Sequence, residues 1–212
     1  MRWKRIGTVL AWVVGLSAFY AVLLGTQTLD AIDKEFPNRG GICTEPSELV
    51  IRYELRAAEI DDDIADALRC VPASHQELAN RFGAKLVIDD EPLEKAFPQI
   101  EVDPVSELAG VYDPKTRTLY VNQRKRYPGK TTLHELGHLV DHALGDPSER
   151  EPYTSIHAAA RARGDLALRL AASPREHFAE SFARYYFSDR TRRRLQEQDA
   201  RTWEYFRDLK AR

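Results

Sequence analysis

The chain has 212 residues, 30% of them charged, and a formal net charge of −2. This length is sufficient for one domain of moderate size with its own core. The near-neutral charge balance lacks the strongly basic character that is typical of nucleic-acid-binding domains, so we expect no nucleic-acid partner.

The N-terminal segment is predicted to be a membrane anchor. Residues 1–5 form a basic flank, and the next 20 residues, Ile6–Gly25, contain no charge. A helix of this length spans about 30 Å, the thickness of a bilayer core, and is longer than the apolar region of a typical cleaved signal peptide. Because a basic flank stays in the cytoplasm, we expect a membrane-anchored protein with its remaining chain outside the cytoplasm. Secretion after signal cleavage is the alternative.

The rest of the chain is predicted to be a stalk followed by one domain. Residues 26–45 are polar and interrupted by proline and glycine, which favours a stalk, and residues 46–212 would form the domain. Cys43 and Cys70 are the only cysteines. An even count in an exported chain favours a disulfide between them.

The first half of this domain mixes predicted helices and strands. Residues 46–70 combine spaced apolar side chains with many acids and are predicted as helix. Ser74-x-x-Glu77 has the pattern of a capping box and would begin a second helix that Gly83 ends.

Strands are predicted next, and helices after them. The predicted strands are residues 85–88 and the two arms of a hairpin, 110–112 and 118–121. Beyond residue 130 the pattern is helical throughout. A small twisted sheet followed by a helical half predicts the α+β class.

The most informative motif is His-Glu-Leu-Gly-His at residues 134–138. It lies in a helix predicted over 131–144, with Thr131 or Thr132 as N-cap and Gly145 beyond its end. His134 and His138 are one turn apart on one face, where a single Zn²⁺ can bind both. Zinc lowers the pKa of a bound water to about 7, and the adjacent Glu135 carboxylate can act as the general base on that water.

Two neighbouring residues bear on this motif. His142 continues the four-residue spacing, but about 12 Å of helix rise separates it from His134, so the two cannot share one ion. Gly137 costs about 0.8–1 kcal/mol relative to alanine inside a helix, which suggests that another backbone or a substrate passes close by. A surface helix carrying two histidines and a glutamate by chance is the alternative to a metal site.

A catalytic zinc normally has three protein ligands, and a later helix offers the third. Glu176 and Glu180 are one turn apart, so the first can bind the metal while the second holds a ligand histidine through its outer N–H. However, Ser173, Pro174 and Glu176 also fit a helix-capping box, which would explain Glu176 without a metal. Glu180 as the ligand, with Glu176 as the cap, is the second alternative.

The two motifs together resemble a known family. His-Glu-Leu-Gly-His-Leu-Val-Asp at 134–141 and Glu-His-Phe-Ala-Glu-Ser-Phe-Ala at 176–183 are similar to the catalytic domains of anthrax lethal factor and the secreted Pro-Pro endopeptidases, which are gluzincin-type zinc metallopeptidases. The resemblance covers roughly residues 75–190. It implies a zincin-like fold, zinc ligands His134, His138 and Glu176, the general base Glu135, and Glu180 as a supporting residue. It also implies that the hairpin strand near 112–121 pairs with an extended peptide substrate.

The chain departs from this family at one position. The family has a tyrosine seven residues before the third ligand, where it stabilises the oxyanion, and Arg169 stands at the matching position here. Arginine is a permanently charged donor and can serve the same purpose. Alternatively, Arg169 is a solvated helix residue, and Tyr153 or Tyr112 takes the role.

We therefore predict a membrane-anchored, extracytoplasmic, zinc-dependent endopeptidase with a peptide or protein substrate. The alternative is a catalytically weak or inactive zincin-like module that binds a peptide or protein without cutting it. Another zinc hydrolase, such as a deformylase, would need a nearby cysteine ligand and a cytosolic setting, and the sequence indicates neither.

Overall fold

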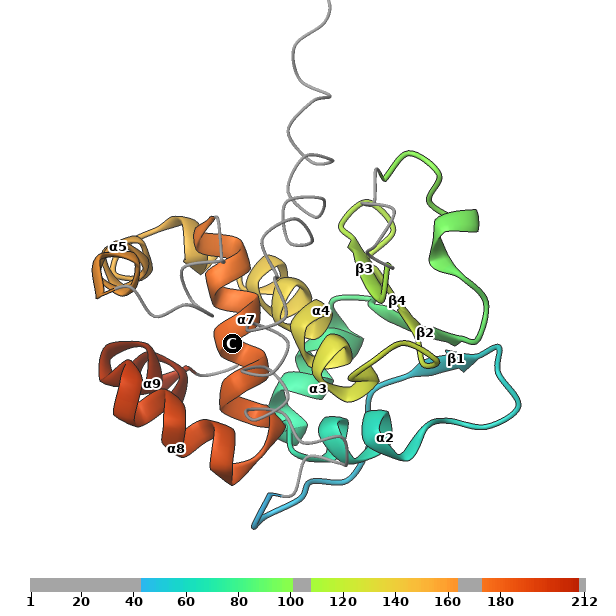
Figure 1. Ribbon diagram of the computed structural model, residues 1–212, viewed down its shortest axis with the longest axis horizontal. Helices are drawn as coiled ribbons and strands as arrows, with labels where there is room; N and C mark the ends of the chain where they lie inside the picture. The colour runs from blue at the N-terminus through green and yellow to red at the C-terminus, as the bar shows by residue number, and fades with distance from the viewer. Residues whose placement is uncertain (1–42, 101–107, 164–172, 210–212) are drawn as a thin grey trace, which may run out of the picture.

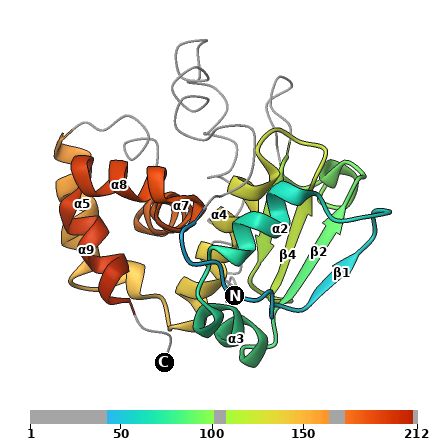
Figure 2. The ribbon, with the colours of Figure 1, turned by 90° about the horizontal axis from the view of Figure 1, so that it is seen from below.

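A single long helix, α4 (Pro128–Ala143), occupies the centre of the molecule (Figures 1 and 2). The computed structural model describes residues 43–100, 108–163 and 173–209. A four-stranded sheet lies on one side of α4, and helices α5, α7, α8 and α9 gather on the other. The predicted α+β class, with a small sheet and a helical C-terminal half, is confirmed.

The sheet is mixed, with strand order β1-β2-β4-β3. Its first three members run parallel, and β3 pairs antiparallel with β4, so β3 is an edge strand. The strands are β1 (Tyr53–Leu55), β2 (Lys85–Asp89), β3 (Gly110–Asp113) and β4 (Thr118–Asn122). The predicted strand at 85–88 and the predicted hairpin are both confirmed.

The predicted helix over 46–70 is wrong for most of its length. Only α2 (Asp62–Arg69) is helical, and β1 precedes it as a strand parallel to β2. Before β1, the buried Gln76 side chain accepts hydrogen bonds from the backbone N–H groups of Val50 and Ile51. These contacts with residues far along the chain satisfy the backbone groups that a helix would otherwise have paired locally.

The next helix, α3 (Ala73–Arg81), has a different N-terminus from the one predicted. Pro72 is its N-cap, and no side chain makes a capping hydrogen bond, so the expected capping box at Ser74 is wrong. Its C-terminus is as predicted, because Gly83 follows in the left-handed conformation with a φ of 80°.

Helix α4 also starts earlier than its sequence pattern indicates. Tyr127 is the N-cap with a φ of 60°, and Pro128 occupies the first turn, where the N–H that proline lacks is not needed. Thr132, one of the two predicted N-caps, lies inside the helix and donates to the Pro128 carbonyl over 2.8 Å. The predicted end at Gly145, with a φ of 78°, is confirmed.

The described part of the C-terminal half is helical, as predicted. Its helices are α5 (Tyr153–Arg163), α7 (Pro174–Phe187), α8 (Asp189–Gln198) and α9 (Ala200–Asp208). Two 3₁₀ turns, η2 (Leu93–Lys95) and η3 (Pro147–Glu149), complete the described elements.

Helices α4 and α7 make the contact that defines the site. A Cβ added at Gly137 would lie 2.8 Å from Ala179 Cα, so the α7 backbone is the close neighbour that this glycine indicated. Phe178 and Phe182 of α7 are fully buried in the core beside α4. The close packing fixes the relative position of side chains on the two helices.

The predicted disulfide between Cys43 and Cys70 is present. Within the described ranges, no helix combines the length and apolar character needed to cross a bilayer. The predicted anchor at residues 6–25, and most of the predicted stalk, lie outside the described residues.

Candidate metal centre

The three side chains predicted to bind zinc lie together between α4 and α7. The Nε2 atom of His134 is 3.3 Å from one carboxylate oxygen of Glu176, and the Nε2 atom of His138 is 3.5 Å from the other. One potential ligand atom from each of the three residues lies within 4.8 Å of the others. The packing of α7 on α4 therefore brings together two motifs that are far apart in the sequence.

This donor set fits a zinc ion. In a tetrahedral site with ligands about 2.0–2.1 Å from the metal, neighbouring ligand atoms are about 3.4 Å apart, close to the two distances above. All three side chains are partly exposed, between 16% and 21%, which leaves access for a substrate. Two imidazoles and one carboxylate also form a donor set known from catalytic zinc sites.

Glu176 makes one of the two capping contacts expected from its sequence position, and its carboxylate lies at the candidate metal site. The Ser173 hydroxyl accepts a hydrogen bond from the backbone N–H of Glu176 and so caps α7. The Glu176 carboxylate is directed at the two histidines instead. The helix cap and the metal-site geometry are thus compatible, since they use different atoms of the same residue.

Glu180 lies on the opposite side of the His134 ring. Its Oε2 atom is 3.4 Å from His134 Nδ1, and the same oxygen is 2.7 Å from the Nζ atom of Lys130. Sequence reasoning missed Lys130, although its position was a usable signal. It stands one turn before His134 and therefore on the same face of α4.

Glu135 lies against the edge strand β3. A Cβ on Gly110 would be 2.9 Å from Glu135 Cγ, so the absence of a side chain there admits the glutamate. The Asn122 N–H donates to the Ala109 carbonyl, and the antiparallel alternation then directs the backbone groups of Gly110 and Tyr112 to the outer edge of β3. The Tyr112 N–H accordingly bonds the Glu135 carboxylate.

The electrostatics of the cluster favour a bound cation. Burial raises the pKa of Glu135 above its ordinary value, although both histidines oppose this. Burial acts in the same direction on Glu176, but the charge of His138 and hydrogen bonds from both histidines hold its pKa well below the ordinary range. For His134, burial lowers the pKa, but hydrogen bonds with Glu176 and Glu180 outweigh it and raise the pKa to about 10. The excess of carboxylates therefore draws positive charge to the imidazoles.

The family model described as "Anthrax toxin lethal factor, N- and C-terminal domain" matches residues 90–209, more than half of the chain. The chain belongs to the anthrax toxin lethal factor family. A comparison with curated proteins found no match.

A solved structure supports the fold of this lethal factor family member. The Pro-Pro endopeptidase PPEP-2 from Paenibacillus alvei superposes with a TM-score of 0.60 at 22% sequence identity. The match covers 74% of this chain and 96% of the PPEP-2 chain. At this identity the likeness shows a shared fold, in agreement with the zincin-like fold expected from the sequence.

Two of the three candidate oxyanion donors, Tyr153 and Tyr112, hydrogen-bond to histidines outside the metal cluster. Tyr153 is fully buried and its hydroxyl is 2.8 Å from His177 Nδ1. The Tyr112 hydroxyl is 2.7 Å from His142 Nδ1, and burial raises the pKa of Tyr112 to about 12. Both hydroxyls are thus engaged by other histidines, and Arg169, the third candidate, lies outside the described residues.

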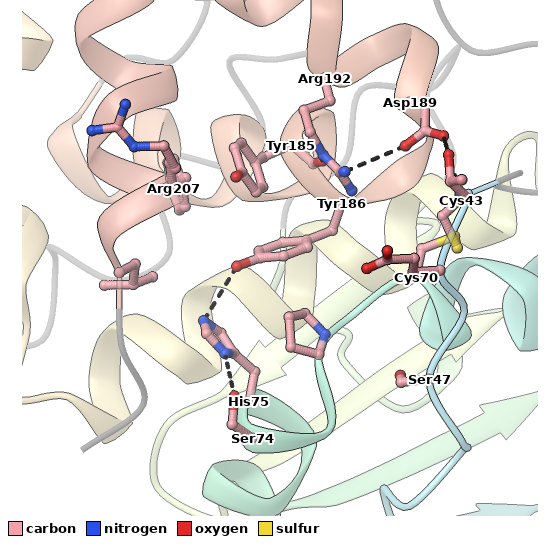
Figure 3. A pocket seen from close by; sticks show the side chains of 15 residues that line it. Cys43, Ser47, Cys70, Ser74, His75, Tyr185, Tyr186, Asp189, Arg192 and Arg207 are labelled. Carbon is pink, nitrogen blue, oxygen red and sulfur yellow. Dashed lines mark hydrogen bonds and ion pairs between the residues drawn. A yellow bond between two sulfur atoms is a disulfide. The ribbon is translucent and has the colours of Figure 1, made fainter.

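A cavity of about 650 Å³ lies elsewhere in this lethal factor family member, beside the disulfide (Figure 3). His75, Tyr185 and Tyr186 are among its lining residues. Tyr185 and Tyr186 belong to the last turns of α7, whereas Glu176 is in the first turn, about 15 Å away along the helix axis. The metal cluster and this cavity are therefore separate features.

Proposed function

We propose that this protein is a zinc-dependent endopeptidase that acts outside the cytoplasmic membrane. The observation that carries the proposal is the convergence of His134, His138 and Glu176, with Glu135 beside them against an edge strand. Membership of the lethal factor family and the fold shared with PPEP-2 support this class of activity.

In this proposal, His134 and His138 bind zinc through their Nε2 atoms, and Glu176 binds it through its carboxylate. Zinc held there supplies Lewis-acid activation of a water molecule and of the scissile carbonyl group. The rigid contact between α4 and α7 holds the three ligands in place, so that little reorganisation is needed during the reaction.

Glu135 is the proposed general base. Its carboxylate accepts a proton from the attacking water and later transfers it to the leaving amine. The Tyr112 N–H orients this carboxylate, and its low exposure of 8% raises its affinity for the proton. Both effects suit a group that must first take up a proton and then release it.

The outer edge of β3 is the proposed binding surface for a peptide. β3 is at the end of the strand order, and no strand among the described residues pairs with its outer edge. An extended peptide can add to such an edge through backbone hydrogen bonds, here to the outward groups other than the Tyr112 N–H that bonds Glu135, and Gly110 would bring it next to Glu135.

The proposed location follows from the sequence. The uncharged run Ile6–Gly25 after a basic flank supports a membrane anchor with the domain outside. The disulfide between Cys43 and Cys70 supports an oxidising compartment.

Metal analysis tests the proposed ligand set. We expect about one zinc per chain in the full-length protein, loss of most zinc in Glu176→Ala, and retained but roughly 10–100-fold weaker binding in Glu180→Ala. Elemental analysis and titration against a chelator measure both quantities. If Glu176→Ala binds zinc like the parent, then Glu180 is the third ligand and Glu176 only caps the helix.

A Glu135→Gln variant separates an enzyme from a binding module, the alternative favoured by the engagement of Tyr112 and Tyr153 elsewhere. We expect its turnover of a peptide library to fall about 10²–10⁴-fold, while zinc content and peptide affinity stay close to the parent values. Glu77→Gln, at an exposed position on α3, is the control. A parent protein that binds peptides but never cleaves them would support the module instead.

A further inference from the structure

We propose that Lys130 is a positioning residue for zinc, acting on the ligand His134 through Glu180. The inference rests on the zinc-binding part of the proposed function and does not depend on peptide hydrolysis. It assigns a role to a lysine that is not among the candidate site residues expected from the sequence.

The geometry is a chain of three contacts that alternates between residues of α4 and residues of α7. Lys130 Nζ lies 2.7 Å from Glu180 Oε2, and this same oxygen lies 3.4 Å from His134 Nδ1. On the other side of the ring, His134 Nε2 faces Glu176 over 3.3 Å. The imidazole is therefore held between two carboxylates, and Lys130 fixes the one that is not a proposed ligand.

Burial gives this ion pair its importance. The Glu180 side chain is 4% exposed and that of Lys130 is 17% exposed. Burying a carboxylate at such a depth is costly without a nearby cation, and without one the side chain would turn away toward water. Lys130 thus keeps a charged oxygen at a fixed place beside the histidine.

The position of that oxygen determines how His134 meets a metal. A histidine that binds zinc through Nε2 must carry its remaining proton on Nδ1, and an acceptor at Nδ1 selects this tautomer and orients the ring. Glu180 Oε2 is at the Nδ1 side of the ring. Loss of Lys130 should therefore weaken zinc binding even though no ligand is removed.

Zinc affinity of the full-length chain tests the proposal, measured by competition with a chromophoric chelator. We expect Lys130→Met to bind zinc roughly 10–100-fold more weakly, in the range observed for partners of metal ligands. Lys130→Arg, which keeps the cation, should recover most of the affinity. Lys95→Met is the matched control, because it removes an exposed 2.6 Å ion pair with Glu91 and should leave zinc affinity unchanged. The absorption spectrum of bound Co²⁺ should also change in Lys130→Met and return in Lys130→Arg.

A double-mutant cycle tests whether Lys130 acts through Glu180. In a Glu180→Gln background, which leaves no carboxylate for Lys130 to hold, adding Lys130→Met should change zinc affinity by less than about threefold. A further large loss would overturn the proposal, as would a Lys130→Met single variant that binds zinc like the parent. If Lys130→Met alone does not fold, Lys130→Gln, which removes the cation but keeps a hydrogen-bond donor for Glu180, replaces it in the cycle, and zinc affinity equal to that of the parent would again overturn the proposal. A parent protein without zinc affinity would instead contradict the proposed function.

Discussion

His134 shows how one residue acquires two different carboxylate neighbours. Glu176 and Glu180 are four residues apart on α7, so both face α4, but the ring of His134 lies between them. The first approaches Nε2, the nitrogen that would bind metal, and the second approaches Nδ1. One helical spacing therefore yields a candidate ligand and its supporting group.

A buried histidine outside the metal cluster, His75, makes the stability of this protein depend on pH. Burial lowers the pKa of His75 from 6.5 to about 4. The unfolded chain thus binds a proton below about pH 6.5, whereas the folded chain does so only below about pH 4. Above pH 6.5, His75 does not reduce the unfolding free energy, because it is neutral in both states. As the pH decreases from 6.5 toward 4, the unfolding free energy should fall by on the order of 3 kcal/mol.

Urea unfolding at several pH values, for the parent and for His75→Gln, measures this contribution. Other groups titrate in both proteins, so the difference between the two curves isolates His75. We expect the parent to lose stability relative to His75→Gln as the pH falls from 6.5 to 4. Parallel curves would mean that His75 is protonated as easily in the folded protein as in the unfolded chain.

At the scale of elements, the close approach of α4 and α7 determines the site. The two histidines of α4 can meet the first turn of α7 because Gly137 has no side chain and the Ala179 backbone packs directly against it. The same approach buries Phe178 and Phe182, so the metal cluster and the core share one helix interface.

A Gly137→Ala substitution should separate these helices. Alanine favours an isolated helix by about 1 kcal/mol, but its Cβ would lie 2.8 Å from Ala179 Cα and 3.0 Å from Phe182 Cβ. We expect a net loss of about 1–3 kcal/mol in unfolding free energy and weaker zinc binding, because the distance between His138 and Glu176 changes. Denaturant unfolding and a chelator titration measure the two effects. A gain of about 1 kcal/mol would show that the interface has room for the added methyl group.

Across the whole molecule, the described N-terminal segment is tied to distant elements. Cys43 is bonded to Cys70 after α2, and Thr44 donates hydrogen bonds to Asp189 at the start of α8. Ser47 donates to the carbonyl of Val71. These contacts close the loop that precedes β1 and join the sheet half of the molecule to the helical half.

The disulfide should contribute measurably to the stability of the whole domain. It spans 27 positions, for which the loop-closure relation gives about 3–4 kcal/mol. We expect the Cys43→Ser/Cys70→Ser double variant to lose about this much unfolding free energy, measured with denaturant. Zinc affinity of the folded variant should be little changed, because the disulfide is near the opposite end of α7 from Glu176. An equal loss in both quantities would show that the two ends of α7 are coupled.

The sequence by itself determined the features that depend on short spacings. The histidine pair, Glu135, the glutamate pair on α7, the hairpin, and the helix end at Gly83 follow from local chemistry and from the periods of helix and strand. The disulfide followed from the presence of only two cysteines.

Only the tertiary structure decided what depends on partners far along the chain. Residues 53–55 are a strand because β2 lies beside them, and the segment before them is held by Gln76, although its own pattern favours a helix. Likewise, the packing of α7 on α4 directs the Glu176 carboxylate at the histidines and puts Lys130 beside Glu180. Local preferences amount to a few tenths of a kcal/mol per residue, and pairing and packing across the fold outweigh them.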